Sequence, residues 1–333
     1  MRALFHFLES RPGRILRYGI SSALLVGFVA FVDWGQFGRL RGQFSAGPVA
    51  LAVFLAGLSY PLHAWRWWML YRAQGLTLSL SWSHMVTWIA NFYGAFLLGG
   101  LGGDAARAFY VCRDAPDQKA AGLASIAIDR LLGLLILLAM ALAAFLAKAG
   151  DATLASQFRT FAQVGGGLLL VGTVGGTLLL ARAPRRWPQW LRNRLGQTAC
   201  AQIEDLRART LAAPGVHLWA FVLSTIVWLL DFVSVWLLAS GVGLRLPFFE
   251  TCIAVSVAYA STALPISIGG HGVREGALLF VLGAFGLIAA EGPDRERALL
   301  LAVLVWAVTM IWSLVGGVVL VFTRQERAPA PLP

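Results

Sequence analysis

Nine long apolar segments constrain the fold of this chain more than any other feature of its sequence. A helix of about 20 apolar residues crosses the roughly 30 Å hydrocarbon core of a bilayer. The sequence therefore predicts an all-α fold, a polytopic transmembrane helical bundle with about seven to nine membrane segments. The segments are residues 18–34, 48–72, 81–103, 120–147, 161–181, 216–240, 249–268, 272–290 and 298–323.

The composition excludes a soluble globular protein. Hydrophobic residues make up 58% of the chain and charged residues 13%, whereas soluble domains carry about 25% charged residues. The formal net charge of +11 is typical of basic cytoplasmic loops in membrane proteins, so we expect no nucleic-acid partner. We predict one transmembrane domain over residues 1–333, crossing the cell inner (cytoplasmic) membrane several times.

Two basic regions predict the orientation of the chain. Several arginines precede the first apolar segment, and seven more lie in residues 182–215. Because arginine-rich loops stay on the cytoplasmic side, we predict that the N-terminus and this basic loop are cytoplasmic. In the loop, Leu191, Leu195, Ile203 and Leu206 recur at near-helical spacing, which indicates either a helix on the membrane surface or an ordinary linker helix. The tail, residues 324–333, is predicted to be disordered.

The number of crossings between these two basic regions must be even, yet five apolar segments lie between them. One segment must therefore enter the membrane and return. Residues 81–112 are the candidate, because Gly94, Gly99, Gly100, Gly102 and Gly103 interrupt the helix. A re-entrant hairpin is allowed at membrane depth only where protein or a water-filled cavity surrounds its broken backbone. The alternative is that 81–103 is a plain span and that the arginine bias does not report the orientation.

A similar glycine pattern occurs in both halves of the chain. Residues 97–107 read LLGGLGGDAAR, and residues 264–274 read LPISIGGHGVR. Each contains a glycine pair and, four residues later, an arginine: Gly102, Gly103 and Arg107, then Gly269, Gly270 and Arg274. By this count of crossings, the segment with the first motif enters the membrane from the cytoplasm and the segment with the second motif enters it from outside. This predicts two broken helix repeats in inverted orientation, in halves of about 48–181 and 216–323, with chance similarity of glycine-rich stretches as the alternative. The first repeat is predicted to be re-entrant, and residues 249–290 form either a hairpin or two full crossings.

The two glycine motifs predict a site for an anion. A helix start presents unpaired N–H groups and partial positive charge, and arginine offers a planar fork of donors suited to phosphate. We expect Arg107 and Arg274 to bind a lipid phosphate, with snorkelling toward the headgroups as the alternative for each. Asp104 is predicted to be an N-cap. His271 holds the matching position, as a capping or packing residue or as a proton-sensitive contact.

Charged pairs within the apolar segments indicate buried partners, because charge is costly at the bilayer centre. Asp129 and Arg130 are neighbours, as are Arg274 and Glu275, and adjacent helical residues do not face each other. We therefore predict that Asp129 pairs with an arginine of the other repeat, such as Arg274, and that Glu275 pairs with Arg130.

Two further charges lie within long apolar segments. Asp231 is midway along residues 216–240, and it is either a proton-coupling carboxylate or a protonated or hydrogen-bonded packing group. Arg66 is flanked by tryptophans near the end of its segment, so we predict that it anchors the membrane interface.

We find no motif in the sequence that carries enzyme chemistry. Lys119 and Lys148 are the two lysines of the chain and neither follows glycine, which excludes a P-loop for ATP. The three cysteines are far apart, and the sequence has no H-E-x-x-H, no G-x-S-x-G and no closely spaced histidine pair. We therefore expect no cofactor, no metal and no catalytic residue.

Three motifs in order resemble the lysylphosphatidylglycerol synthase transmembrane family of flippase-like proteins. They are LGGLGGDAAR ending at Arg107, IDRLLG around Asp129, and LPISIGGHGVRE ending at Glu275, with Arg66 before Trp67. The resemblance covers residues 15–323 and implies a membrane domain that translocates or binds lipids. The positions that it marks are Gly102, Gly103, Asp104, Arg107, Asp129, Arg130, Pro265, Gly269, Gly270, Gly272, Arg274 and Glu275.

The sequence departs from this family in two respects. Leu98 stands where the family often has proline, so the first helix break is expected to be softer. The soluble aminoacyl-transferring domain of the bifunctional members is not found, so we do not expect lipid synthesis.

These observations together predict a lipid translocator. We expect an intramembrane polar cavity in which Arg107, Arg274 and Arg130 bind the phosphate headgroup of an anionic phospholipid or a lipid-linked glycan. One alternative is a small-solute secondary transporter, and another is a membrane enzyme that acts on a lipid headgroup. A third is a membrane partner of a lipid synthase or glycosyltransferase, recruited through the basic loop.

Overall fold

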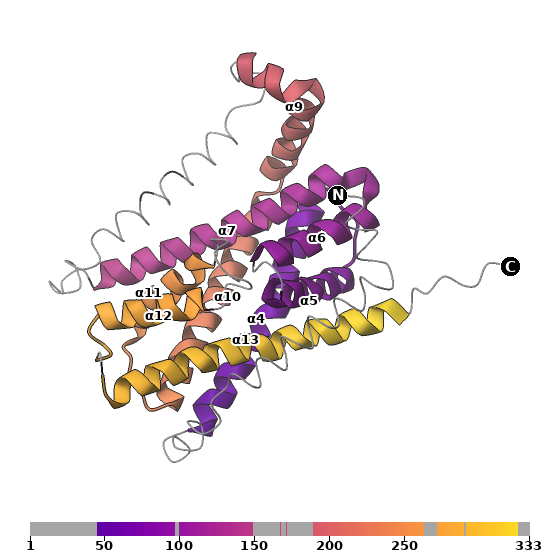
Figure 1. The fold of residues 1–333 in the computed structure, drawn as a ribbon. Helices are drawn as coiled ribbons and strands as arrows, with labels where there is room; N and C mark the ends of the chain where they lie inside the picture. The colour runs from indigo at the N-terminus through magenta and orange to yellow at the C-terminus, as the bar shows by residue number, and fades with distance from the viewer. Residues whose placement is uncertain are drawn as a thin grey trace. The chain divides into compact units, whose positions relative to one another are not determined.

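The computed structural model describes residues 45–96, 100–148, 167, 171, 189–262, 272–289 and 291–325. Within these ranges the chain forms helices and turns (Figure 1). Four sequence predictions lie outside the described residues: the first span at 18–34, the segment at 161–181, the residues Gly269, Gly270 and His271, and most of the tail.

Among the described residues, four helices are long and apolar enough to cross a membrane. They are α4 (Ala46–Ala73), α7 (Lys119–Ala147), α10 (Pro214–Gly241) and α13 (Pro293–Gln325). Their positions confirm the predicted segments 48–72, 120–147, 216–240 and 298–323 to within a few residues. α13 begins earlier than predicted, because Pro293 starts the helix and Asp294 and Glu296 place negative charge in its first turn. The protein is a multi-pass membrane protein.

Over the same described ranges, four shorter helices that pack with these come in two pairs. The first pair is α5 (Leu80–Phe96) with α6 (Gly100–Asp114), and the second is α11 (Phe248–Ser261) with α12 (Val273–Ala284). The longest has 17 residues, or about 25 Å at 1.5 Å per residue, which is less than the roughly 30 Å hydrocarbon core. Within each pair the two helices pack against each other. We call the pairs the α5–α6 and α11–α12 hairpins.

The alternative of one plain span over 81–103 is therefore wrong, whereas the prediction of a broken element there agrees with the two helices. The first helix ends at Phe96, and the next helix begins at Gly100, ahead of the glycine pair. The glycine pair continues the helix because it allows close packing: a Cβ at Gly103 would lie 2.9 Å from the carbonyl oxygen of Ala90 in α5. The segments predicted at 249–268 and 272–290 also end earlier, at Ser261 and Ala284.

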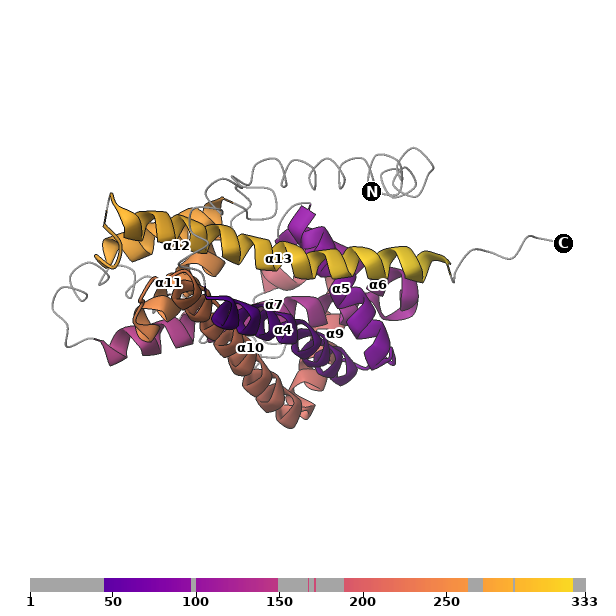
Figure 2. The ribbon, with the colours of Figure 1, turned by 90° about the horizontal axis from the view of Figure 1, so that it is seen from below.

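The two hairpins leave from opposite ends of the helical bundle. The start of α4 lies beside the end of α10, where the Ser45 amide donates to the Gly241 carbonyl at 2.8 Å. At the other end, the Gln74 side chain after α4 donates to Thr210 at 2.8 Å, just before α10. α5 follows α4 and α11 follows α10, so the hairpins start at opposite ends (Figures 1 and 2). The internal sequence repeat stays a prediction.

Helix α4 is central to the bundle. It packs along α10 and also contacts α5, α7 and α13. The Trp312 indole of α13 donates to the Val53 carbonyl at 2.9 Å, and Gly57 leaves room for that ring. Pro61 lies inside the helix, where it cannot donate the usual hydrogen bond to the carbonyl of Gly57. α13 also approaches α5 closely, because a Cβ at Gly316 would collide with the Trp88 carbonyl.

The basic loop contains a helix, α9 (Gln189–Ala212), which Gly196 interrupts with a φ of 80°. Its C-terminal part docks on the turn after α4, where Arg209 donates to the Gln74 carbonyl at 2.6 Å. Leu206 packs against the core cluster that includes Trp67 and Leu76. The helix predicted in this loop is thus present, and its place on the membrane surface stays a prediction.

Candidate functional site

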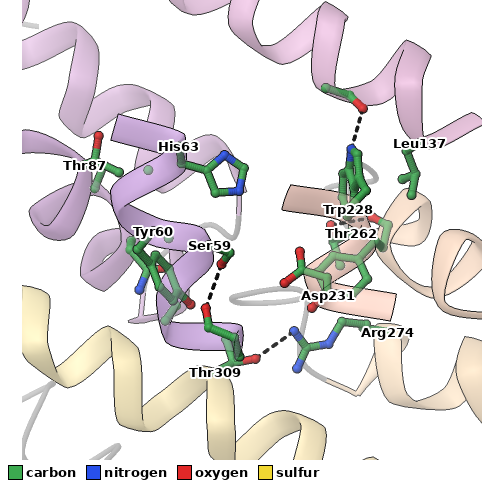
Figure 3. Close-up of a pocket in the computed structure, with 18 of the residues that line it drawn as sticks. Ser59, Tyr60, His63, Thr87, Leu137, Trp228, Asp231, Thr262, Arg274 and Thr309 are labelled. Atoms are coloured by element: carbon green, nitrogen blue, oxygen red, sulfur yellow. Dashed lines mark hydrogen bonds between the residues drawn. The ribbon is translucent and has the colours of Figure 1, made fainter. Parts of the chain in front are cut away.

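A polar cavity of about 380 Å³ lies among the membrane helices. Both hairpins and all four long helices contribute to its wall, and Figure 3 shows α4 facing α10 and α12 across it. Seven of its lining residues carry a formal charge, four arginines and three aspartates, which gives a net charge of +1. They are Arg66, Arg107, Arg130, Arg274, Asp104, Asp129 and Asp231.

A buried ion cluster forms one part of the wall. Asp129 on α7 accepts from Arg66 Nε at 2.7 Å and from Arg107 Nη1 at 3.0 Å. Arg66 also donates to the hydroxyl of Ser224 at 2.7 Å. One carboxylate thus joins guanidinium groups from α4 and α6 and leaves one positive charge uncompensated. Asp129 was predicted to pair with an arginine of the other repeat, such as Arg274; its partners are arginines, but they are Arg66 and Arg107 of its own half, so the pairing across the repeats is wrong.

Arg66 is not the interfacial anchor that its tryptophan neighbours predict. It is only 3% exposed, because Asp129 on the adjacent α7 supplies the opposite charge. Its guanidinium group lies beside Gly133, where a Cβ would be 3.6 Å from Nη1. Trp67, the next residue, donates to Ser125 at 3.2 Å and fixes the same pair of helices.

The α5–α6 hairpin brings Arg107 and Asp104 to the cavity. The Arg107 guanidinium group lies 4.8 Å from the centre of the Trp67 ring, a cation–π contact. Asp104 does not cap the helix, because α6 begins four residues earlier at Gly100. Instead, its carboxylate lies 3.4 Å from Arg130 Nε. Gly103 lines the cavity, while Gly102 lies in the first turn of α6, where backbone N–H groups lack helical acceptors.

The α11–α12 hairpin brings Arg274 to the same cavity. Its Nε and Nη2 donate to Glu275 Oε1 at 3.0 and 2.7 Å. Its Nη1 donates to Thr309 on α13 at 3.1 Å, a bond that Figure 3 shows. The predicted pair of Glu275 with Arg130 is therefore wrong. Glu275 also accepts from the Gly272 amide at 2.7 Å, so it caps α12 while its other oxygen meets the long side chain of its neighbour.

Asp231 points into the cavity from α10, on the side that Arg274 also faces (Figure 3). Among the residues that the structure describes, it has no hydrogen-bond or ion-pair partner. The contact with Arg274 therefore remains electrostatic, without a direct bond.

The sequence interpretation missed a polar face on α4. Ser59, Tyr60, His63 and Arg66 all line the cavity. Ser59, His63 and Arg66 are spaced by four and three residues, so they share one side of the helix. Three polar residues at helical spacing within an apolar span were the available signal. Asn91 of α5 also lines the cavity and donates to Ser313 at 3.1 Å.

Within the described ranges, no group of three or more His, Cys, Asp or Glu residues could hold a metal ion. The three cysteines are not disulfide-bonded. The cavity therefore offers guanidinium, carboxylate, hydroxyl and amide groups, which bind a charged headgroup by hydrogen bonds and ion pairs.

Comparison with known proteins agrees with this membrane architecture. A family model described as lysylphosphatidylglycerol synthase TM region matches residues 14–317. No curated protein matches the chain in sequence. The family model covers most of the sequence, in agreement with the motif resemblance. The chain belongs to the lysylphosphatidylglycerol synthase TM region family and is a membrane protein connected to lipid metabolism or translocation.

Proposed function

We propose that the protein moves an anionic phospholipid or a lipid-linked glycan between the two leaflets by binding its phosphate headgroup in the cavity. One observation carries the proposal: Arg107 and Arg274, from hairpins that start at opposite ends of the bundle, line the same cavity. A headgroup bound there is within reach of donors from both hairpins.

The charge of the cavity favours an anion. Asp129 compensates only one of the two guanidinium groups that it contacts, whereas Arg274 is paired one to one with Glu275. The uncompensated positive charge therefore lies at Arg66 and Arg107. A phosphate can replace Asp129 as the acceptor for Arg107, because Arg66 alone continues to neutralise the buried carboxylate.

The outer face of α7 favours a lipid over a small solute. Arg130 and Leu134 line the cavity, and both are exposed: Arg130 at 46% of its side chain and Leu134 at 36%. Leu123, seven residues before Arg130, is exposed on the same face of the helix, and Leu131 is exposed beside it. A headgroup can thus enter beside Arg130 while its acyl chains remain in the bilayer. No covalent step is needed, and an ion gradient or removal of the lipid from one leaflet supplies the direction.

A leaflet-exchange assay tests this proposal. Purified protein is placed in vesicles with fluorescent phosphatidylglycerol, and the outer-leaflet label is quenched over time. Arg107→Ala and Arg274→Ala each remove charge-assisted hydrogen bonds worth about 1.5–3 kcal/mol, so we expect exchange to slow by about tenfold or more. Arg72→Ala is the matched control, because Arg72 lies over the Trp68 ring and does not line the cavity. Equal rates in all four proteins would reject the proposal.

Lipid identification separates this function from its alternatives. Native mass spectrometry of the wild-type protein is expected to show a bound anionic lipid that is lost in Arg107→Ala. Uptake of a water-soluble phosphate compound without lipid exchange would instead indicate a small-solute transporter. A stable complex with a lipid synthase or glycosyltransferase, with no exchange in vesicles, would indicate a partner role.

A further inference from the structure

Asp231 differs from the other carboxylates of the cavity. Asp129 is bound by Arg66 and Arg107, and Asp104 lies beside Arg130. Asp231 has neither an ion pair nor a hydrogen bond among the described residues, although it lies midway along α10, a helix that is long and apolar enough to cross the membrane. An ionised carboxylate without a partner is costly at that depth. It must therefore bind a proton or attract a cation.

The surroundings of Asp231 contain one cationic candidate. The titratable groups that interact with it electrostatically are Tyr60 of α4, Tyr259 of α11 and Arg274 of α12. His63 of α4 also lines the cavity, but it interacts with the cluster of Arg66, Arg107 and Asp129 instead. The charged residues of α6 and α7 that line the cavity are already paired with one another or with Arg66. On α13 the polar lining residue is Thr309, which does not titrate. Arg274 is thus the cation that an ionised Asp231 would attract.

Each of the three guanidinium nitrogens of Arg274 already donates one hydrogen bond in the arrangement described here. Two of its nitrogens donate to Glu275 and the third donates to Thr309. In this arrangement the carboxylate of Asp231 receives no donor from the described residues, which costs less free energy while that carboxylate is neutral. An ionised Asp231 would compete with Glu275 and with any bound phosphate for the same guanidinium group.

We propose that Asp231 is a proton-binding site that controls the availability of Arg274 to the lipid headgroup. A proton from cavity water binds a carboxylate oxygen of Asp231 and neutralises it, and Arg274 is then free to exchange Thr309 for a phosphate oxygen. Loss of the proton restores the negative charge, which draws Arg274 away from the phosphate. Proton binding and headgroup binding therefore promote each other, as linkage requires. This inference rests on the proposed function.

Vesicle assays at several pH values test the coupling. We expect leaflet exchange by the wild type to change by about fivefold or more between the protonated and ionised states, the range of a typical coupling free energy. Asp231→Asn is expected to exchange lipid at a rate that no longer depends on pH, because its side chain cannot ionise. Asp231→Glu restores a titrating group and is expected to restore the pH dependence. Asp294→Asn, at a side chain 54% exposed at the start of α13, should behave as the wild type.

A spectroscopic measurement distinguishes the failure of this inference from failure of the proposed function. Infrared difference spectra between high and low pH should contain a protonated-carboxyl band in the wild type that Asp231→Asn lacks, with or without lipid. The inference is rejected if the rate of exchange by the wild type does not depend on pH and the protonated-carboxyl band is absent. The proposed function still stands in that case, provided that Arg107→Ala and Arg274→Ala slow lipid exchange. A pH dependence that Asp231→Asn retains would also reject it.

Discussion

Replacing Asp129 with asparagine tests the buried ion cluster on which the cavity wall depends. The carboxylate holds Arg66 at 2.7 Å and Arg107 at 3.0 Å, and the side chains of Asp129 and Arg66 are each 4% exposed. Asparagine has nearly the same shape and keeps one acceptor oxygen. It removes the charge, however, so two guanidinium groups from different helices remain close together without a counter-ion.

The expected loss of stability follows from the geometry. Two unit charges about 4 Å apart attract by about 4 kcal/mol at an effective dielectric constant of about 20, and Asp129 makes two such contacts. Part of this attraction is offset, because the neutral side chain avoids the cost of burying a carboxylate. Measured losses on breaking a buried ion pair are about 3–5 kcal/mol. We expect Asp129→Asn to lower the free energy of unfolding by that amount.

Denaturant titration in detergent micelles, followed by tryptophan fluorescence, measures this loss. Asp205→Asn is the control: it breaks an ion pair with Arg209 in which both side chains are at least 40% exposed, so it should cost at most about 1 kcal/mol. The double variant Arg66→Gln with Asp129→Asn should lose less free energy of unfolding than the two single variants lose in sum. In each single variant one buried charge loses its partner, whereas the double variant removes both charges of that pair. An Asp129→Asn variant as stable as the control would refute the reasoning.

Two further predictions concern contacts between helices, one a close packing contact and the other an ion pair. Gly316→Val should lower the unfolding temperature in detergent, because its side chain would collide with the Trp88 carbonyl and Phe92 at a cost of about 1–3 kcal/mol; Gly276→Ala has open space and should be neutral or stabilising. Lys148→Met should lower the free energy of unfolding by about 1–2 kcal/mol, because Glu250 is 6% exposed and loses its partner at 3.0 Å. Lys148→Arg should retain most of that stability, and equal unfolding curves for both variants would contradict the role of this pair.

The long helices were predictable because their signal is local. An apolar stretch of the right length is enough to define α4, α7, α10 and α13. The α5–α6 hairpin was also predictable as a broken element, from the arginine distribution and the glycines. The break was predicted at the glycine pair, but the helix continues through it. A glycine pair can either end a helix or allow two helices to pack closely, and Gly103 allows α6 to approach Ala90 of α5 closely.

The ion pairs were not predictable, because the sequence shows the period of each helix but not which helices meet. Asp129 had several arginines within reach of a plausible fold, and α4 presents Arg66 only because that helix packs against α7. Glu275 was assigned a distant partner on the rule that adjacent helical residues do not face each other. The rule fails where a cap fixes the glutamate and the arginine is long enough to fold back onto it.

Pro61 has a consequence for how the cavity could open. It follows Tyr60 in α4 and precedes His63, and both of these line the cavity. A missing hydrogen bond at that depth makes it the natural place for a hinge. Each half of α4 is tethered separately, one by Ser45 to Gly241 and the other by Gln74 to Thr210. A tilt of one half about Pro61 would therefore move one part of the cavity wall while the other half of α4 keeps its own tether.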